Sequence, residues 1–345
     1  MKFAVVNNCV PFVSGGAEHL ATALVSKLIE YGHQAILVRI PFRWEPPSKI
    51  VECMLACRLM RLPNVDRMIG LKFPAYYLPH PDKRLWLLHQ FRQAYDFWGT
   101  PFQGLPDTPE GGEIRETIIR ADNTWLTQVG KIYTNSHVTS GRLKRFNNID
   151  SEVLFPPLLD AGHFHTASYD DFIFYPSRIT ASKRQRLVVE SMQYVRTGVR
   201  LIIAGKAEAA EDLHEIEDIV RRHRLEGRVE ILSRFIGEQE KADLFSRALG
   251  CAYVPYDEES YGYVTLESFY SRKPVITCTD SGGTDVVVKD GITGYVVAPQ
   301  PRAIADAMDK LYDDKAAARR MGEAGHDLIQ KLNITWDRVV EAFTQ

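Results

Sequence analysis

The regular alternation of short apolar runs with amphipathic segments is the feature that most constrains this fold. Residues 3–6 (FAVV) and 34–40 (QAILVRI) are typical of buried strands. Between them, residues 17–32 (AEHLATALVSKLIEYG) place apolar side chains every three or four positions and end in Gly32, as an amphipathic helix does. A strand, a helix and a second strand in this order favour a parallel sheet covered by helices.

The same alternation continues in two series. Further strands are expected at 84–89 (RLWLLH) and 131–136 (KIYTNS), before a proline-rich junction at 153–160 (VLFPPLLD). Six more apolar runs follow it, at 171–177, 199–205, 228–232, 251–256, 274–278 and 294–297, most of them separated by helical segments such as 211–225 and 237–249. The chain is therefore predicted to be α/β, with two Rossmann-like, doubly wound domains facing across a cleft.

Composition is that of a globular protein and excludes several other classes. With 345 residues the chain has room for two domains, and 45% hydrophobic content is enough to form a full core. The net charge of −2 provides no drive toward nucleic acid, and no run approaches the 18 apolar residues of a membrane span. Five scattered cysteines are interpreted as free thiols in a reducing compartment, so a cytoplasmic location is expected.

The stretch YDEESYGYVTLES, residues 256–268, combines an acidic loop with the start of a helix near Val264. Amides of Gly262, Tyr263 and Val264 at a helix N-terminus would suit phosphate oxygens. Glu267 could bind a ribose hydroxyl pair, and Glu259 could bind hydroxyls at the other end of an extended ligand. A nucleotide sugar has hydroxyls at both ends and negative charge between them. The simpler alternative is that Glu267 only complements the helix dipole.

A second pattern, YPSRITASKRQRL at 175–187, places Arg178 and Lys183 in a short loop after a strand. Such a cation pair could neutralise a leaving diphosphate, although surface cations are more often simply solvated. Arg184 and Arg186 are expected to have that ordinary surface role.

Two weaker signals come from the N-terminal half. Gly15 and Gly16 would permit close approach of a ligand to the backbone, but a plain turn explains them as well. Glu18 most simply complements the following helix N-terminus. His89 ends an apolar strand and could face a cleft, whereas the usual alternative is a hydrogen-bonded core histidine.

Together these motifs resemble the retaining nucleotide-sugar glycosyltransferases of family four, which have the two-domain GT-B fold. The stretches that carry the resemblance are SGGAEHLATALVSKLIEYGHQAILV, NSHVTSGRLKRF, VLFPPLLDAGHF, PSRITASKR, LIIAGKAE, EESYGYVTLES, SGGTDVVVKDGITGYVV and TWDRVVEAF. The most specific of these signs is the spacing of Glu259 and Glu267, with seven residues between them.

The resemblance implies domains at 1–160 (acceptor-binding) and 161–328 (nucleotide-sugar-binding), with a C-terminal helix, 329–345, returning to the N-terminal domain. It implies four residues at the reacting centre: His89 beside the sugar, Arg178 and Lys183 on the phosphates, and Glu259 on the donor sugar. It further implies donor contacts from Gly15, Gly16, Gly205, Phe235, Ile236, Tyr261, Gly262, Tyr263, Val264 and Glu267. Asp285 and Lys206 depart from common family residues, so the identity of the donor stays open.

The implied reaction is retaining hexosyl transfer from a UDP- or GDP-linked sugar to a glycan, glycolipid or other hydroxyl acceptor, in polysaccharide or lipopolysaccharide-type biosynthesis. The diphosphate would leave from the face on which the acceptor attacks, without a covalent intermediate. No Asp-x-Asp pair stands at a strand end, so metal independence is predicted, and no cofactor is expected.

Two alternatives from other classes remain. A nucleotide-sugar epimerase of the same fold would act on the donor without an acceptor. A non-catalytic nucleotide-sugar-binding protein would bind without turnover.

Residues 49–84 carry a local excess of positive charge, with seven Lys or Arg against three acidic residues, interleaved with apolar side chains. One hypothesis is that this segment contacts an anionic or lipid-linked acceptor at the inner face of a membrane. A solvated excursion of loop and helix is the alternative.

Overall fold

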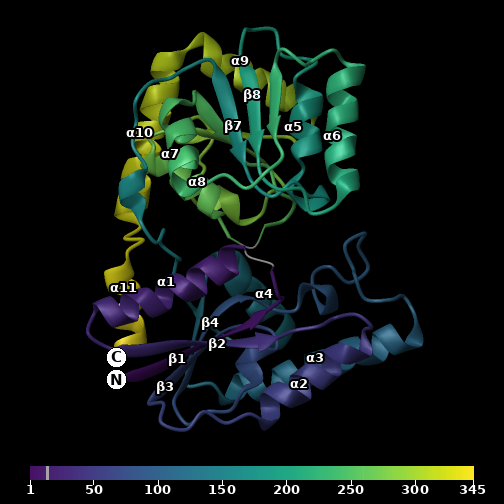
Figure 1. The fold of residues 1–345 in the computed structure, drawn as a ribbon, viewed down its shortest axis with the longest axis vertical. Helices are drawn as coiled ribbons and strands as arrows, with labels where there is room; N and C mark the ends of the chain where they lie inside the picture. The colour runs from purple at the N-terminus through teal and green to yellow at the C-terminus, as the bar shows by residue number, and fades with distance from the viewer. Residues whose placement is uncertain (13–14, 259) are drawn as a thin grey trace. The chain divides into compact units, whose positions relative to one another are not determined.

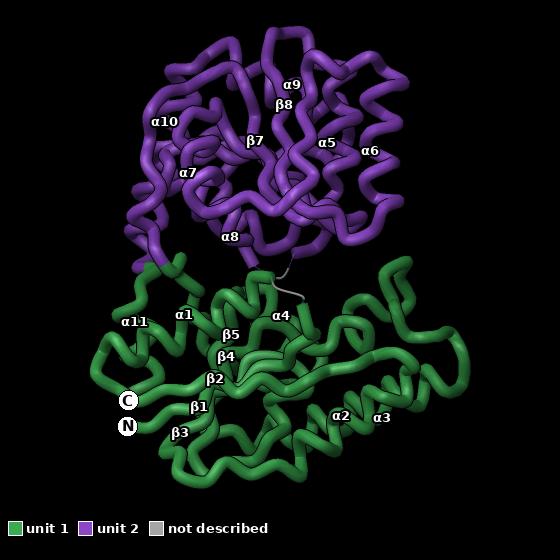
Figure 2. Tube along the Cα trace, viewed as in Figure 1, with its two compact units in different colours: residues 1–159, 334–345 green, residues 160–333 purple. Residues whose placement is uncertain are grey.

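The computed structural model describes residues 1–12, 15–258 and 260–345. The chain divides into two compact units, shown in Figure 2: unit 1 comprises Met1–Leu159 with Ile334–Gln345, and unit 2 comprises Asp160–Asn333. The predicted division was at 160/161 and 328/329.

Unit 1 is built on a six-stranded parallel sheet in the order β2-β1-β3-β4-β5-β6. Its strands are β1 (Lys2–Cys9), β2 (Gln34–Pro41), β3 (Arg67–Lys72), β4 (Lys83–His89), β5 (Lys131–Thr134) and β6 (Glu152–Val153). Its helices are α1 (Gly16–Glu30), α2 (Ser48–Leu59), α3 (Pro109–Trp125), α4 (His137–Asn147) and α11 (Trp336–Thr344), with short 3₁₀ turns η1 (Ala75–Tyr77), η2 (Arg92–Ala94) and η3 (Leu126–Gln128).

Helices cover both faces of this sheet (Figure 1) because alternate strand residues point to opposite sides. In β1, Phe3 and Val5 pack in the core formed with α1 and α11, whereas Ala4 and Val6 pack in the core formed with α2 and α3. A strand with two buried faces reads as a continuous apolar run, which is why FAVV was recognisable in the sequence.

The C-terminal helix α11 is held in unit 1 by polar contacts at both ends. The Trp336 indole donates to the Leu158 carbonyl at 2.7 Å. At the other end, Arg67 donates to the Phe343 carbonyl at 2.5 Å, and Arg84 donates to the Ala342 carbonyl at 2.9 Å. Two guanidinium groups thus satisfy the last carbonyls of the helix, where positive charge is favoured.

Unit 2 also has a six-stranded parallel sheet, in the order β12-β11-β10-β7-β8-β9. Its strands are β7 (Phe172–Pro176), β8 (Arg200–Ala204), β9 (Val229–Leu232), β10 (Gly250–Ala252), β11 (Val275–Cys278) and β12 (Gly294–Val297). Its helices are α5 (Gln185–Ser191), α6 (Ala210–Arg222), α7 (Glu238–Arg247), α8 (Tyr263–Tyr270), α9 (Pro301–Asp313) and α10 (Lys315–Lys331), with 3₁₀ turns η4 (Ala161–His163), η5 (Ala181–Lys183) and η6 (Gly283–Val286). Helices α5, α6 and α9 cover one face, and α7, α8 and α10 cover the other (Figure 1).

The predicted α/β class with two Rossmann-like parallel sheets is confirmed. Two details of the sequence interpretation were wrong. Strand β1 continues to Cys9, beyond the predicted strand 3–6, and the buried Asn8 amide donates to the Phe73 carbonyl at 2.6 Å. Strand β3, in the middle of the sheet, was missed because both of its end residues, Arg67 and Lys72, are charged. The segment that contains it was interpreted by its positive charge.

Among the described residues, no helix is both long and apolar enough to cross a membrane. All five cysteines are free thiols: Cys57, Cys251 and Cys278 are buried, and Cys9 and Cys53 are partly exposed.

Candidate functional site

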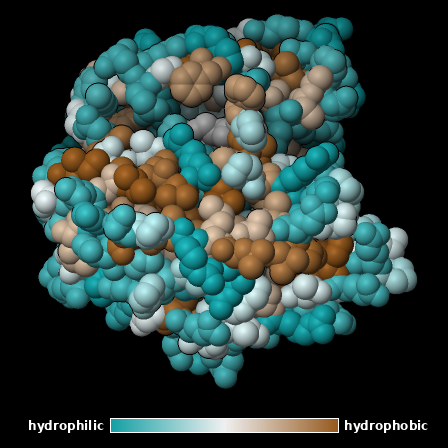
Figure 3. Space-filling model, turned by 60° about the horizontal axis from the view of Figure 1, so that its bottom comes forward, coloured by the Kyte–Doolittle hydropathy of each residue, from teal (hydrophilic) through white to brown (hydrophobic). Residues whose placement is uncertain are grey.

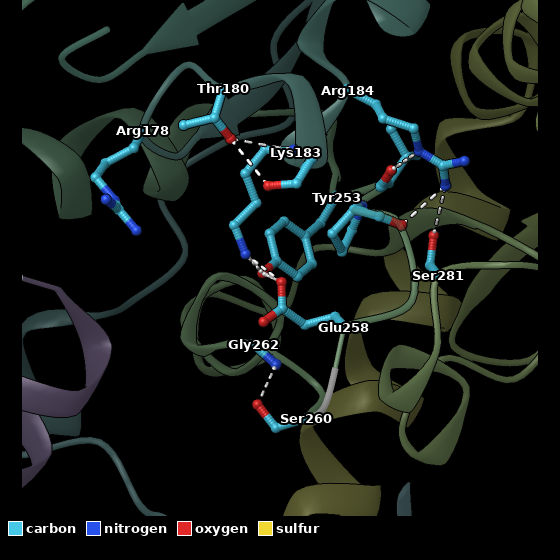
Figure 4. A network of polar contacts seen from close by, with 12 residues as sticks. Arg178, Thr180, Lys183, Arg184, Tyr253, Glu258, Ser260, Gly262 and Ser281 are labelled. Atoms are coloured by element: carbon cyan, nitrogen blue, oxygen red, sulfur yellow. Dashed lines mark hydrogen bonds and ion pairs between the residues drawn. The ribbon is translucent and has the colours of Figure 1, made fainter. Parts of the chain in front are cut away.

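The candidate site in unit 2 lies where loops follow β7, β10 and β11. Because these strands are parallel neighbours in the sheet, their carboxyl ends meet at one edge, where α/β proteins bind ligands. Figure 4 shows the loop after β7, with Lys183, directed toward the loop after β10, with Tyr253 and Glu258.

Lys183 contacts the polar side chains of Tyr253 and Glu258 in the second loop. Its Nζ lies 3.1 Å from the Tyr253 hydroxyl and forms an ion pair with the Glu258 carboxylate. The lysine and glutamate side chains are 19% and 15% exposed, so the pair is screened by water less than a surface pair is. The Tyr253 hydroxyl and Glu258 Oε2 are 3.3 Å apart, so Lys183, Tyr253 and Glu258 contact one another in one polar cluster.

The Glu258 backbone is fixed by the loop after β11. Its amide donates to the Ser281 carbonyl at 3.2 Å, and its carbonyl accepts from the Gly283 amide at 2.8 Å. Gly282, at φ +68°, has no room for a side chain, since a Cβ would lie 2.3 Å from the Glu258 carbonyl oxygen. Two loops are therefore locked together directly before Glu259, which lies outside the described residues.

The two predicted phosphate-binding cations have different surroundings. Arg178 has a half-exposed side chain and forms an ion pair with Glu208 at 3.4 Å. In Figure 4 it lies to one side of Lys183, and no dashed line joins it to Lys183, Tyr253 or Glu258. The structure therefore leaves Arg178 on the surface beside the site and places Lys183 within it.

The expectation that Arg184 is an ordinary surface residue was wrong. Its guanidinium binds both carboxylate oxygens of Asp280, at 2.8 and 2.7 Å, and donates to the carbonyls of Val254 and Pro255. Arg184, in the segment after β7, thus contacts the loop after β11 through this bidentate pair and the loop after β10 through the two carbonyls. Arg186 does have an exposed surface role, pairing with Glu190 and Glu215.

Helix α8 begins at Tyr263, directly after Gly262, close to the predicted start. Gly262 has φ +72°, and a Cβ there would lie 2.4 Å from a ring carbon of Tyr253. Only glycine fits this position, so the helix N-terminus lies directly against the Tyr253 ring. The Gly262 amide donates to the Ser260 hydroxyl at 3.4 Å, Val264 lies within the first turn, and Tyr261 is buried.

Glu267 is buried in the second turn of α8, at 5% exposure. Lys241 of α7 donates to its Oε1 at 2.6 Å and also pairs with Glu238 at 3.0 Å. Burial raises the pKa of the Glu267 carboxyl, and the Lys241 charge opposes that rise. A buried carboxylate held by a lysine is more than a helix-dipole complement, and the sequence interpretation did not identify Lys241.

The other predicted donor contacts in unit 2 occupy neighbouring loops. Gly205 directly follows β8, and a Cβ there would lie 2.0 Å from the Ser177 carbonyl oxygen, so glycine allows this loop to pack on the one that carries Arg178. Phe235 precedes α7 and is 76% exposed, whereas its neighbour Ile236 is buried.

The predicted residues of unit 1 lie around the N-terminus of α1 and the end of β4. Gly15 caps α1, and Gly16 is its first residue. The Gly15 amide donates to Glu18 Oε2 at 2.9 Å, as expected for a carboxylate at a helix N-terminus. Glu18 also pairs with Lys72 at 3.5 Å, and Lys72 is the register partner of His89. The His89 Nδ1 lies 2.6 Å from the Gln90 carbonyl oxygen.

Unit 1 also contains a buried polar cluster that was not anticipated from the sequence. The Asp122 carboxylate in α3 accepts hydrogen bonds from the hydroxyls of Tyr76, Tyr77 and Tyr95, at 2.9, 2.7 and 2.7 Å. Burial raises the pKa of Asp122 to about 6, and the three hydroxyls oppose the rise. The Asn147 amide connects Tyr95 to Gln90, the neighbour of His89.

Not all of the positive charges of residues 49–84, the segment hypothesised to contact a membrane, lie at the surface. Arg67 and Lys83 are buried, and Arg67 and Arg84 bind the end of α11. Lys83 donates to the Tyr76 carbonyl at 3.2 Å, and burial lowers its pKa to about 8. These charges serve the interior of unit 1, and the exposed part of the segment is α2 and the turn after it.

Across the described ranges, no group of three or more His, Cys, Asp or Glu side chains is arranged to hold a metal ion.

Comparison with known proteins identifies the relatives of both the sequence and the fold. Residues 164–327 match the family model of the group 1 glycosyl transferases. Alpha-1,3/1,6-mannosyltransferase ALG2 from Dictyostelium discoideum is 35% identical over 121 residues, covering 35% of this chain and 28% of that protein. The mouse protein of the same name is 27% identical over 239 residues, covering 60% of this chain and 57% of that protein.

Solved structures match over the whole chain. Sucrose-phosphate synthase from Thermosynechococcus elongatus has a TM-score of 0.80 at 18% identity, covering 100% of this chain and 97% of that one. Anabaena Alr3699/HepE in complex with UDP and glucose has a TM-score of 0.73 at 14% identity, covering 100% and 99%. At these identities the likeness shows the fold.

The chain spans between about a quarter and three fifths of the length of the curated mannosyltransferases that it matches. Its group 1 match, covering most of unit 2, and its fold agree with the resemblance seen in the sequence. By sequence this chain is similar to the glycosyltransferases of family 4, and it has their two-domain GT-B fold.

Proposed function

We propose that this protein is a retaining hexosyltransferase that moves a sugar from a nucleotide-diphosphate sugar to a hydroxyl of a glycan or glycolipid acceptor, in polysaccharide or lipopolysaccharide-type biosynthesis. The observation that carries the proposal is the edge of unit 2. There, the Lys183 cation, the N-terminus of α8 and the buried Glu267 carboxylate come from adjoining elements. A cation and helix-start amides suit a diphosphate, and a carboxylate suits the ribose hydroxyls.

The roles of the residues follow from their chemistry. Lys183 and the amides of Gly262, Tyr263 and Val264 stabilise the negative charge of the leaving diphosphate. Arg178 adds a further positive charge from the surface. The exposed Phe235 ring offers a face on which a base can stack. In unit 1, Gly16 at the N-terminus of α1 suits a donor phosphate, and His89 suits the reacting sugar.

The proposed reaction needs no carboxylate nucleophile. The acceptor hydroxyl attacks from the face that the diphosphate leaves, and a diphosphate oxygen takes its proton. Because cationic and amide groups stabilise the leaving group, we propose that turnover requires no divalent metal and no cofactor. Full activity in the presence of EDTA is the expected result, and loss of activity that Mg²⁺ or Mn²⁺ restores would overturn this part.

An epimerase and a non-catalytic binder are the two competing functions. The relatives named above have transferase or synthase names, which favours transfer. Product analysis with donor alone detects an epimerase, since it needs no acceptor. Binding without turnover on any acceptor would favour the binder.

The first test is a calorimetric screen of UDP, GDP, ADP and their common sugars against the wild type and Glu267→Ala. Strong binding of one nucleotide by the wild type, lowered at least about 100-fold in the variant, is expected if Glu267 holds the ribose through charged hydrogen bonds. Glu215→Gln, at an exposed carboxylate paired with Arg186, is the control. The absence of binding across the panel would overturn the proposed donor site.

Contact with the inner face of a membrane is the proposal for the acceptor side, now restricted to α2. Leu55, Leu59 and Met60 are 55%, 78% and 37% exposed, and they lie near the cationic Arg58 and Arg61. Figure 3 brings the lower end of the view in Figure 1 forward and shows apolar areas between polar ones. Exposed apolar side chains beside cations suit a surface of anionic lipid.

Liposome flotation tests this contact. Vesicles containing anionic lipid should retain the wild type and release a Leu55→Ser/Leu59→Ser variant, and neutral vesicles should retain less of either. Equal retention of the two proteins on anionic vesicles would overturn the contact.

A further inference from the structure

The charge on Lys183 is already balanced inside unit 2. Its Nζ pairs with the Glu258 carboxylate and lies 3.1 Å from the Tyr253 hydroxyl. An ionised carboxylate only accepts hydrogen bonds, so it can satisfy a lysine but repels a phosphate. A diphosphate that approached Lys183 with Glu258 in this position would meet a negative charge in a partly buried, weakly screened place.

The position of Glu258 is built into the loop. Its backbone is bonded on both sides to residues 281–283, and Arg184 ties the same loops together through Asp280. Displacement of the carboxylate from Lys183 would then be a rotation of the Glu258 side chain, with its backbone held in place. Rotation would expose the Lys183 ammonium group together with the Tyr253 hydroxyl, which can donate to a phosphate oxygen.

The N-terminus of α8 lies against the same tyrosine. Gly262 packs on the Tyr253 ring so closely that a Cβ would clash with it. Lys183, Tyr253 and the helix start thus adjoin one another, and Glu258 is the anion placed among them (Figure 4). A carboxylate at this point takes the position of a ligand anion.

We propose that Glu258 is a built-in counter-anion of the donor site, whose carboxylate occupies the position on Lys183 that a donor phosphate takes and must be displaced for binding. This inference rests on the proposed function. Glu258 is accordingly an affinity-determining residue. It lowers the fraction of molecules whose Lys183 is open to a phosphate, and the apparent affinity equals the affinity of the open site multiplied by that fraction.

Calorimetric titration of Glu258→Gln with UDP, GDP and ADP tests the inference. Removing the competing charge should tighten binding of the preferred diphosphate about tenfold, as for a site that is open about one tenth of the time. The nucleoside without phosphates should bind equally well to both proteins, because it does not reach Lys183. Glu215→Gln removes the same charge from an exposed ion pair and should leave affinity unchanged.

Two further variants separate charge from other effects. Glu258→Ala should show the same gain as Glu258→Gln. A gain with Gln alone would mean a new amide contact and would overturn the inference. In a Lys183→Met background, Glu258→Gln should give a clearly smaller gain than in the wild type, since no cation remains to be released and only direct repulsion of the phosphate is relieved; an undiminished tenfold gain would also overturn it.

Failure of the inference differs from failure of the proposed function. Wild-type binding of a nucleotide without a gain in Glu258→Gln overturns the inference alone. No binding by any of these variants overturns both. Binding by Glu258→Gln where the wild type binds too weakly to measure supports the inference in its strongest form.

Discussion

Asp122 in unit 1 and Glu267 in unit 2 are both buried carboxylates on helices, at 0% and 5% exposure, but they have different partners. Asp122 accepts from three tyrosine hydroxyls, which engage both of its oxygens. Glu267 is bonded at Oε1 by the Lys241 ammonium group. Burial raises the pKa of both carboxyls. Neutral tyrosine hydroxyls oppose the rise at Asp122, and the Lys241 cation opposes it at Glu267.

The difference separates a structural carboxylate from one suited to a ligand. The hydroxyls around Asp122 come from η1 and the segment after η2, so this residue joins three parts of the core of unit 1. Glu267 lies one turn into a helix whose N-terminus adjoins the candidate site. Burial alone therefore does not identify a functional carboxylate. The elements that supply its hydrogen-bond partners, and how near it lies to the edge of the sheet where ligands bind, are more informative.

The largest expected effect is on the stability of unit 1. Asp122→Ala leaves three buried tyrosine hydroxyls without their acceptor, so we expect a loss of about 4 kcal/mol in the free energy of unfolding. All five tryptophans, at 44, 86, 98, 125 and 336, belong to unit 1, so urea unfolding followed by tryptophan fluorescence reports this unit alone. Asp107→Ala, at an exposed position, is the control. A loss below about 1 kcal/mol would show that the cluster does not hold the core together.

The next effect concerns pH. The folded pKa of Asp122, about 6, lies above its ordinary value of 3.8, so the folded state binds the additional proton between these values. Stability from this group is therefore fully present below about pH 4 and is lost as pH rises through about pH 6. The loss amounts to about 3 kcal/mol for about two pKa units. Urea midpoints of the wild type and Asp122→Asn should diverge over this range, whereas parallel curves would contradict the assignment.

A smaller effect is expected at the second carboxylate. Lys241→Met removes the charge that opposes the raised pKa of Glu267, and a less fully ionised carboxyl accepts weaker hydrogen bonds from a ribose. We expect nucleotide affinity near pH 7 to fall about tenfold, with tryptophan-detected unfolding unchanged. Lys331→Met, at an exposed lysine of the same unit, is the matched control. Affinity equal to that of the wild type would mean that Glu267 needs no lysine.

Much of the fold was predictable because its strands are buried on both faces. Strands β1, β7 and β8 contain the uninterrupted apolar runs FAVV, FIFYP and LIIA, which stood out in the sequence. Strand β3 did not, because Arg67 and Lys72 at its ends resemble surface residues. The buried Arg67 pairs with Asp82 and donates to a carbonyl of α11, which is about 276 positions away in the chain.

The candidate site was predictable in part for a similar reason. Gly262 and Glu267 belong to one local motif, so their relation to the start of α8 follows from helix geometry. Lys183, Tyr253 and Glu258 adjoin through pairing of β7 with β10, and no local spacing indicates that contact.

The sequence by itself determined the alternation of strands and helices, the parallel α/β class and the helix start that follows the acidic loop. These depend on periodicity and local backbone preference, which act over a few residues. Only the tertiary structure decided which charges are paired and buried: Arg67 with α11, Asp122 with three tyrosines, Lys241 with Glu267, and Lys183 with Glu258. Pairing of a charge depends on groups brought close by the sheet order and the packing of helices, and these contacts join residues far apart in the chain.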